Sequence, residues 1–214
     1  MLPVSLGGVG DMSILETDVL LTRSSEAEAD SQFIRRWSPR AMSGEVVSLG
    51  EIEQLVEAAR WAPSCFNSQP WRFVYALRGT PQWKPMFDLI MDMNQAWAKD
   101  AGALVAIVAR TTFEHNNAPA PTYSFDTGSA WMSFALQAQG MGLVTHAMWG
   151  VEHDQAPAVL NLGKAYKLQA MVAVGRSGDK RELPQPLQDR EVPSPRKAIS
   201  ELVFVGQLPT EPQS

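Results

Sequence analysis

The chain has 214 residues and a formal net charge of −5, from 18 basic and 23 acidic side chains. This length is sufficient for one sizeable buried core. The acidic balance argues against nucleic acid or an anionic membrane as the main partner, and no apolar run is long enough to span a bilayer. The single cysteine excludes an internal disulfide and fits a reducing compartment, so we expect a cytoplasmic protein.

The N-terminal region shows little regular pattern. Residues 1–12 are predicted to be a flexible terminus, and residues 13–214 a single domain. The glycine-rich run Leu6–Gly10 does not follow a strand, so it is not a dinucleotide-binding fingerprint. A helix is expected from about Ile14, with apolar residues as far as Ile34, before a loop at Trp37-Ser38-Pro39.

The next stretch alternates helix and strand signals. Ser48-Leu49-Gly50-Glu51 is a capping box, which predicts the start of a helix. A strand is predicted at 71–77 and a helix from Pro81 to about Lys99. The uninterrupted apolar run at 103–109 is typical of a central strand that is covered on both faces.

The second half of the chain repeats this alternation. Residues 111–122 are rich in proline and asparagine and predict a mobile surface loop. A helix is predicted from Asp126 to Gly140 or Gly142, then a strand at 143–149, a brief helix at 155–160 and a strand at 168–174. Four strands separated mostly by helices indicate a layered α/β or α+β domain.

The segment after Gly175 is rich in proline and charge and has no strong periodicity. A tail of this length without its own core is unusual in a compact domain, so it is either disordered or packed on another surface. Its apolar residues, Ala198-Ile199 and 202–205, need such a surface. An extension that wraps a second subunit would provide it.

Common catalytic patterns are missing: the chain has no Gly-x-Ser-x-Gly, His-Glu-x-x-His or Walker-type phosphate loop. Its three histidines lack the spacing of a zinc site, so we expect no bound metal. One positive signal is the run 34–40, whose arginines and serine suit a phosphate. The alternative is a solvated basic helix end.

Two further segments are candidates for ligand contact. The rigid Pro63–Pro70 loop could present backbone amides to a flat polar ring, or it could simply join a helix to a strand. Thr145–Gly150 could offer exposed N–H groups where a strand ends, or be a core strand with a turn. Cys65 could be a reactive thiol, although such a residue is more often an inert small hydrophobe.

These segments together resemble the nitroreductase family of flavoproteins. The matching elements occur in the family's order between about Arg35 and Val205: Arg36-Trp37-Ser38-Pro39-Arg40, Ala62-Pro63-Ser64-Cys65-Phe66-Asn67-Ser68-Gln69-Pro70-Trp71-Arg72-Phe73, Asp126-Thr127-Gly128-Ser129-Ala130, Gly142–Gly150 and Pro195-Arg196. The second element is specific, whereas the basic element alone is weak. The chain departs from the family at Trp37 and Ser194, where many relatives have basic residues, and at Cys65, where serine is usual. Arg35 is a candidate to supply the missing charge.

The resemblance implies an α+β fold, a three-layer α/β/α sandwich with a mostly antiparallel central sheet. It also implies an intertwined homodimer with an exchanged C-terminal extension, and FMN at the dimer interface. Phe66 would face the substrate. The implied cofactor-binding residues are Arg36, Trp37, Ser38, Arg40, Pro63, Ser64, Cys65, Asn67, Asn94, Trp97, Ala147, Met148, Trp149, Gly150 and Arg196.

The activity that the resemblance implies is an FMN-dependent oxidoreductase. NAD(P)H would reduce the flavin, and a nitroaromatic, quinone or similar electron-poor acceptor would reoxidise it in a ping-pong cycle. Because the cofactor performs the redox chemistry, no catalytic acid or nucleophile is required of the protein. The alternatives are a flavin-binding or regulatory protein with little turnover, and a specialised flavoenzyme such as a dehalogenase or an enone reductase.

Overall fold

The computed structural model describes Val19 and residues 22–210, which divide into two compact units. The sheet unit comprises residues 38–192. The terminal unit comprises the described parts of residues 1–37 and 193–214. The predicted flexible terminus (1–12), the Leu6–Gly10 run and the helix start near Ile14 lie outside the described residues. A single domain over 13–214 stays a prediction.

The sheet unit contains the four predicted strands. They are β1 (Trp71–Leu77), β2 (Ala103–Arg110), β3 (Val144–Met148) and β4 (Tyr166–Gly175), arranged in the order β1-β2-β4-β3. All three pairings are antiparallel, and the β2–β4 register shifts once, between Ile107 and Val108. The predicted strands and the antiparallel sheet are confirmed.

The apolar run of β2 is buried on both faces, as predicted. Successive side chains of a strand point to opposite faces, so alternate residues of β2 belong to different cores. One core contains Ala103, Val105 and Ile107, and the other contains Leu104, Ala106 and Val108. This burial explains why β2 shows no alternation of polar and apolar residues.

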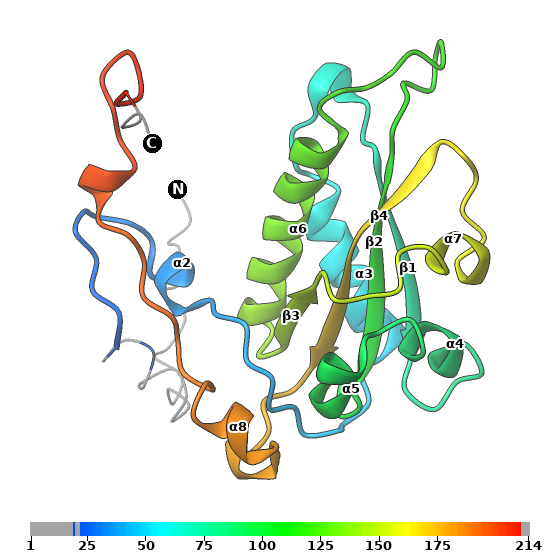
Figure 1. Cartoon of the computed structure of the whole chain (residues 1–214), viewed down its shortest axis with the longest axis vertical. Coiled ribbons are helices and arrows are strands. Elements are labelled where there is room, and N and C mark those ends of the chain that lie inside the picture. The colour runs from blue at the N-terminus through cyan, green and yellow to red at the C-terminus, as the bar shows by residue number, and fades with distance from the viewer. Residues whose placement is uncertain (1–18, 20–21, 211–214) are drawn as a thin grey trace, which may run out of the picture. The chain divides into compact units, whose positions relative to one another are not determined.

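Helices cover both faces of the sheet (Figure 1). One layer is α3 (Leu49–Ala59) with α6 (Tyr123–Gly140), and the other contains α4 (Trp83–Phe87), α5 (Asp92–Ala98) and α7 (Ala156–Val159). An antiparallel sheet between two helical layers is the α+β sandwich predicted from the sequence, which is thereby confirmed.

The capping box at the start of α3 is also confirmed. The Glu51 backbone N–H donates to Ser48 Oγ at 3.2 Å, and Glu51 Oε2 accepts from the Ser48 backbone N–H at 2.8 Å. These bonds satisfy two N–H groups that have no partner within the helix. Local sequence therefore determines where α3 begins.

The helix predicted from Pro81 to Lys99 is divided into α4 and α5. Between them, Ile90 forms an antiparallel bridge with Val151, and the Met91 N–H donates to Gly150 O at 3.0 Å. These long-range bonds replace helical ones, so the chain leaves the helix at this point. The division brings α5 beside the chain that follows β3.

The terminal unit contains α2 (Ser31–Arg35), which begins at Asp30, whose Oδ1 accepts from the Gln32 N–H at 2.9 Å. Residues 23–30 are not helical, so a continuous helix from Ile14 to Ile34 is not formed. The 3-10 turn Ile199–Glu201 lies in the C-terminal part of this unit.

The segment after Gly175 was predicted to be either disordered or packed on another surface, because it lacks a core of its own. Its first part packs within the sheet unit, through the 3-10 turn Lys180–Glu182, α8 (Gln185–Gln188) and the buried residues Leu183 and Glu191.

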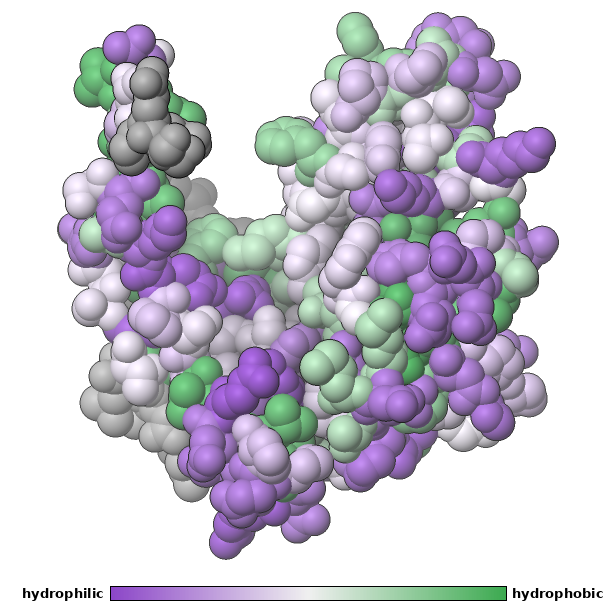
Figure 2. All heavy atoms as spheres, in the orientation of Figure 1, coloured by the Kyte–Doolittle hydropathy of each residue, from purple (hydrophilic) through white to green (hydrophobic). Residues whose placement is uncertain are grey.

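On the face shown in Figure 2, hydrophilic side chains predominate and hydrophobic areas lie between them. Within the described residues, no helix is both long and apolar enough to cross a membrane.

Candidate functional site

The loop between α3 and β1 has an unusual backbone. Phe66, Asn67 and Gln69 have positive φ angles of 51°, 53° and 44°. Residues other than glycine rarely adopt this backbone conformation, which costs on the order of 1–3 kcal/mol per residue. Strained residues of this kind cluster at functional sites, where the surrounding structure holds them in place. Three of them within four positions therefore mark this loop as a candidate site.

The loop is held from α6 by Asp126. This carboxylate is only 4% exposed, and its Oδ2 accepts from the Cys65 N–H at 3.2 Å and from the Thr122 hydroxyl at 3.0 Å. Within the loop, the Gln69 N–H donates to Ser64 Oγ at 3.0 Å. Asp126 thus fixes the position of the predicted contact residues Ser64 and Cys65.

Sequence reasoning used Asp126 only as a helix start and a family motif. Its position had a readable signal, because Asp126, Ala130, Phe134 and Ala138 follow one another at intervals of four. All four are buried on one side of α6. A carboxylate on the apolar stripe of a helix needs a buried hydrogen-bonding partner.

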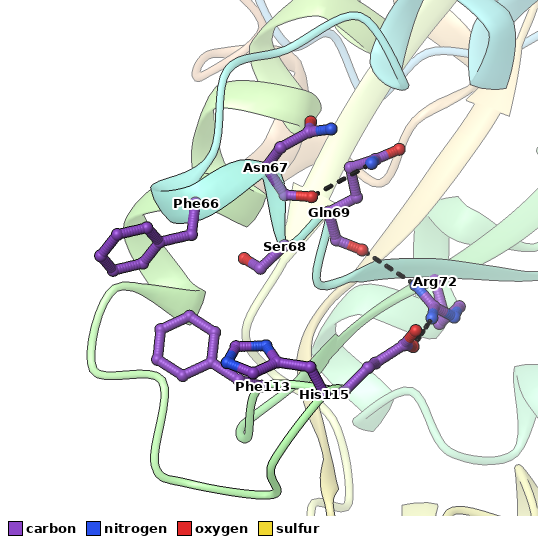
Figure 3. Close-up of a pocket in the computed structure, with 8 residues that line it drawn as sticks. Phe66, Asn67, Ser68, Gln69, Arg72, Phe113 and His115 are labelled. Atoms are coloured by element: carbon purple, nitrogen blue, oxygen red, sulfur yellow. Dashed lines mark hydrogen bonds and ion pairs between the residues drawn. The ribbon is translucent and has the colours of Figure 1, made fainter.

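A pocket of about 340 Å³ opens beside this loop. Residues 111–122 form its other side, and they close on themselves through the Phe113 N–H to Ala118 O and Ala120 N–H to Thr111 O bonds, each 2.9 Å long. Figure 3 shows Phe66 and Phe113 at one end of the pocket and Arg72 at the other. The lining residues are Phe66, Asn67, Ser68, Gln69, Arg72, Phe113, Glu114 and His115.

A second predicted group is brought together by α5 and the end of β3. Asn94 Nδ2 donates to Gly150 O at 3.4 Å. A Cβ atom at position 150 would lie 2.6 Å from Asn94 Nδ2, so any larger residue there would displace the Asn94 amide. Trp149 is 65% exposed and packs on the His153 ring at a centroid distance of 4.1 Å. An amide, a bare backbone segment and an accessible aromatic ring are therefore neighbours.

Two residues predicted near the cofactor have their side chains in the core. Trp97 is only 1% exposed and packs on His146 at 4.6 Å, and Met148 is 3% exposed. The large apolar ring of Trp97 is used in packing, and its place beside a ligand stays a prediction. Met148 has only its backbone for such a contact, and Ala147 is partly buried.

The terminal unit contains a cluster of three arginines, Arg23, Arg36 and Arg196. Burial lowers the pKa of the Arg36 guanidinium, and the charge of Arg196 lowers it further. The pKa of Arg23 is lowered by burial, then by Arg196 and Arg36. Guanidinium groups carry a positive charge in proteins, so the mutual repulsion within this cluster creates a place where an anion is stabilised.

Arg23 is a member of this cluster that sequence reasoning missed. Its Nη1 donates to Ile34 O and Arg36 O, both at 2.8 Å, and its Nε donates to Ser194 O at 3.0 Å. Arg196 Nη1 also donates to Ser194, to its O at 3.2 Å and to its Oγ at 3.1 Å, so two guanidinium groups lie beside Ser194. Arg35 was the residue expected to supply the additional charge. The sequence offers little signal for this, because 171 positions separate Arg23 from Ser194.

The predicted basic element is divided between the units: Arg36 and Trp37 belong to the terminal unit, and Ser38 and Arg40 to the sheet unit. The buried carboxylate of Glu191 accepts from the Arg40 N–H at 2.5 Å and lies 3.6 Å from Arg40 Nη1. Arg40 is thus not a freely solvated cation. Glu191, like Arg23, is a residue of this region that was not predicted from the sequence. Trp37 and Ser38 are partly buried.

Other chemistries find little support in the described part of the chain. No three His, Cys, Asp or Glu side chains gather there in a way that could hold a metal ion. The features above define an α+β sandwich with an arginine cluster suited to an anion and a strained loop beside an aromatic pocket.

Comparisons with known proteins agree with this description. The family model described as Nitroreductase family matches residues 34–82. A crystal structure described as an oxidoreductase containing FMN is 38% identical, has a TM-score of 0.85, and covers 88% of this chain and 97% of its own. The chain therefore belongs to the nitroreductase family, which confirms the resemblance seen in the sequence.

More distant structures share the fold. A nitroreductase family protein from Clostridium difficile 630 is 18% identical with a TM-score of 0.65, covering 85% of this chain and all of its own. A protein from Exiguobacterium sibiricum 255-15, solved in complex with FMN, is 20% identical with a TM-score of 0.68, covering 85% and 98%. The search of curated proteins gives no match.

Proposed function

We propose that this chain binds FMN and uses it to transfer hydride from NAD(P)H to an electron-poor acceptor, such as a nitroaromatic or a quinone, in a ping-pong cycle. The observation that carries the proposal is the cluster of Arg23, Arg36 and Arg196, whose repulsion a phosphate would relieve. The 38% identical relative, an oxidoreductase that contains FMN, supports the same cofactor. The single cysteine and the absence of a disulfide fit a cytoplasmic enzyme.

The arginine cluster suits the phosphate of FMN. Guanidinium groups donate paired hydrogen bonds that match phosphate oxygens, and charge-assisted bonds of this kind are roughly twice as strong as neutral ones. In the proposed arrangement, Arg36 and Arg196 bind the phosphate and Arg23 braces them. Ser38 and Arg40 contribute near the ribityl chain, with Arg40 oriented by Glu191.

The flat ring of FMN would be bound by residues of the sheet unit. Gly150 has no side chain and the Asn94 amide lies against its backbone, so both could approach the edge of a planar ring. In the proposed dimer, the Pro63–Asn67 loop, including Ser64 and Cys65, would supply backbone groups to the ring bound mainly by the other subunit. Trp149 would shield the ring from water, because its side chain is exposed and packs on the His153 ring.

FMN, when bound, would supply the hydride acceptor and donor. The protein residues would bind it, orient it and exclude water, and Phe66 would face the acceptor. The absence of a catalytic triad or a metal motif in the sequence is consistent with this division of labour.

We also propose that the protein is a homodimer with exchanged C-terminal segments. Val205 is 99% exposed, and Ile199, Leu202, Val203 and Leu208 are exposed as well. Figure 2 shows hydrophobic side chains on this segment. Apolar side chains gathered on one segment favour burial against another surface. A Val205→Asp change is expected to shift the dimer towards monomer in sedimentation velocity; an unchanged dimer would argue against this exchange.

The function is tested first by colour. Purified protein should be yellow, contain FMN, and lose its flavin absorbance on addition of NAD(P)H without oxygen. An acceptor should then restore the absorbance with turnover. A colourless protein that takes up no added FMN would contradict the proposal, and FMN without NAD(P)H oxidation would favour a flavin-binding protein with little turnover.

The arginine cluster is tested by Arg36→Ala. Losing one charge-assisted contact should weaken FMN binding about ten- to a hundredfold while the circular dichroism spectrum is unchanged. Arg181→Ala, which removes an exposed arginine paired with Asp179 outside both candidate sites, is the control and should retain FMN. Equal FMN affinity in both variants would show that Arg36 does not bind the FMN phosphate.

A further inference from the structure

The pocket beside the strained loop has an aromatic end. Phe66 is 87% exposed, and its ring meets Phe113 edge to face, with centroids 6.0 Å apart. Phe113 in turn lies 5.7 Å from the His115 ring. A single exposed phenylalanine is ordinary, but Phe66 also has a strained backbone, so two unfavourable features coincide in it. Contact of its ring with a ligand would explain both.

The other end of the pocket is cationic. Arg72 Nη2 donates to Glu114 Oε1 at 2.7 Å, and Arg110 Nη1 lies 3.5 Å from the same oxygen. Two guanidinium groups thus share one carboxylate, which leaves one positive charge in excess. This local charge is opposite in sign to the net charge of the chain. An anionic group is therefore favoured at this end.

The wall between the two ends is polar. Ser68 Oγ is buried and has no hydrogen-bond partner in the structure, although Ser68 lines the pocket. Figure 3 shows the Ser68 hydroxyl on the side of Phe66 and Phe113, with Arg72 at the opposite end. Buried hydroxyl groups normally have a partner, so Ser68 adds an unsatisfied polar group directly behind this wall.

We propose that this pocket selects acceptors that combine one or two aromatic rings with a carboxylate. The ring packs against Phe66 and Phe113, and the carboxylate is recognised by Arg72. A volume of about 340 Å³ lies within the usual range for small-molecule sites and limits the ligand to this size. This inference rests on the proposed function, because it names the class of acceptor for that reaction.

Selection is tested with a pair of acceptors that differ in charge, 4-nitrobenzoate and 4-nitrobenzamide. In each reaction NAD(P)H supplies hydride and solvent a proton, so the nitro group becomes a nitroso group with release of one water. We expect kcat/KM of the wild type to favour the benzoate about tenfold, the effect of one charge-assisted contact. The ratio of the two values cancels any general change in activity.

The variants should move this ratio in opposite directions. Arg72→Gln should abolish the preference, Arg72→Lys should retain part of it, and Glu114→Gln should increase it by removing the competing carboxylate. Arg60→Gln removes an exposed arginine that pairs with Glu57 outside this pocket, and it should leave the ratio unchanged. A ratio that Arg72→Gln and Glu114→Gln leave unchanged would overturn the proposal.

A binding measurement separates this inference from the proposed function. Benzoate and benzamide are not reduced, and their binding can be followed by ligand-observed NMR in wild type and Arg72→Gln. Benzoate binding that depends on Arg72, without reduction of any acceptor, would contradict the proposed reductase activity but support carboxylate recognition in the pocket. Reduction of both nitro compounds without Arg72-dependent benzoate binding would support the reductase activity but contradict carboxylate recognition in the pocket.

Discussion

The strand β2 and the Ser64–Gln69 loop differ in how well their backbone suits their residues. β2 is a strand of mainly apolar side chains, and Leu104 to Val108 are almost completely buried. In the loop, Phe66, Asn67 and Gln69 have positive φ angles, a backbone conformation that is unfavourable for residues other than glycine. Stability is therefore concentrated in the sheet, and its surplus allows the loop to keep an unfavourable shape that suits a ligand.

The largest effect is expected in β2. Leu104→Ala removes a completely buried side chain and leaves a cavity between β2 and the α4–α5 layer. The free energy of unfolding should fall by about 2–5 kcal/mol, measured by urea denaturation. The control Val46→Ala, at an exposed position, should change it by less than about 0.5 kcal/mol. Similar values for both would mean that β2 is not the main source of stability.

The next effect concerns the residue that holds the loop. Asp126→Ala leaves the Cys65 N–H and the Thr122 hydroxyl without their shared acceptor, so unfolding should become about 1–3 kcal/mol easier. Because the loop loses its anchor, kcat/KM for acceptors should fall as well. Asp154→Ala, at an exposed aspartate, is the control. Lower stability with unchanged kinetics would show that Asp126 does not position the site.

A smaller effect, of opposite sign for stability and activity, is expected in the loop itself. Phe66→Gly relieves a positive φ and should raise the unfolding free energy by roughly 0.5–1 kcal/mol, while acceptor turnover falls. Asn161→Gly makes the same kind of change outside the pocket, at φ 51°. It should give a smaller gain and leave turnover unchanged. A lower free energy of unfolding in Phe66→Gly would contradict the view that the positive φ of Phe66 destabilises the folded state.

The smallest effect concerns pH and the regular part of the fold. Hydrogen bonds to the Glu51 carboxylate lower its pKa from the ordinary value of 4.5; the bond from the Ser48 backbone N–H has the largest effect, and the bond from Arg176 the next largest. A lowered pKa in the folded state gives stability that is present above pH 4.5 and lost as pH falls below it. The stability difference between wild type and Glu51→Gln should therefore shrink on acidification. Glu53→Gln, on the exposed side of α3, is the control.

Much of the fold could be read from local patterns. The Ser48–Glu51 capping box, the apolar run of β2 and the helical spacing of α6 each depend on residues close in sequence, and each is confirmed. The division of the helix at 81–99 could not be read from the sequence, because the Ile90–Val151 bridge joins residues 61 positions apart. Local propensity has no information about such a partner.

The candidate site shows the same limit. The sequence by itself determined the family, the sheet between two helical layers, and the segments that carry Arg36, Ser64 and Gly150. Only the tertiary structure decided that Asp126 anchors the loop, that Arg23 joins the arginine cluster and that Glu191 pairs with Arg40. The physical reason is that a charge is identified by its type in sequence, whereas its partner is set by how distant segments pack.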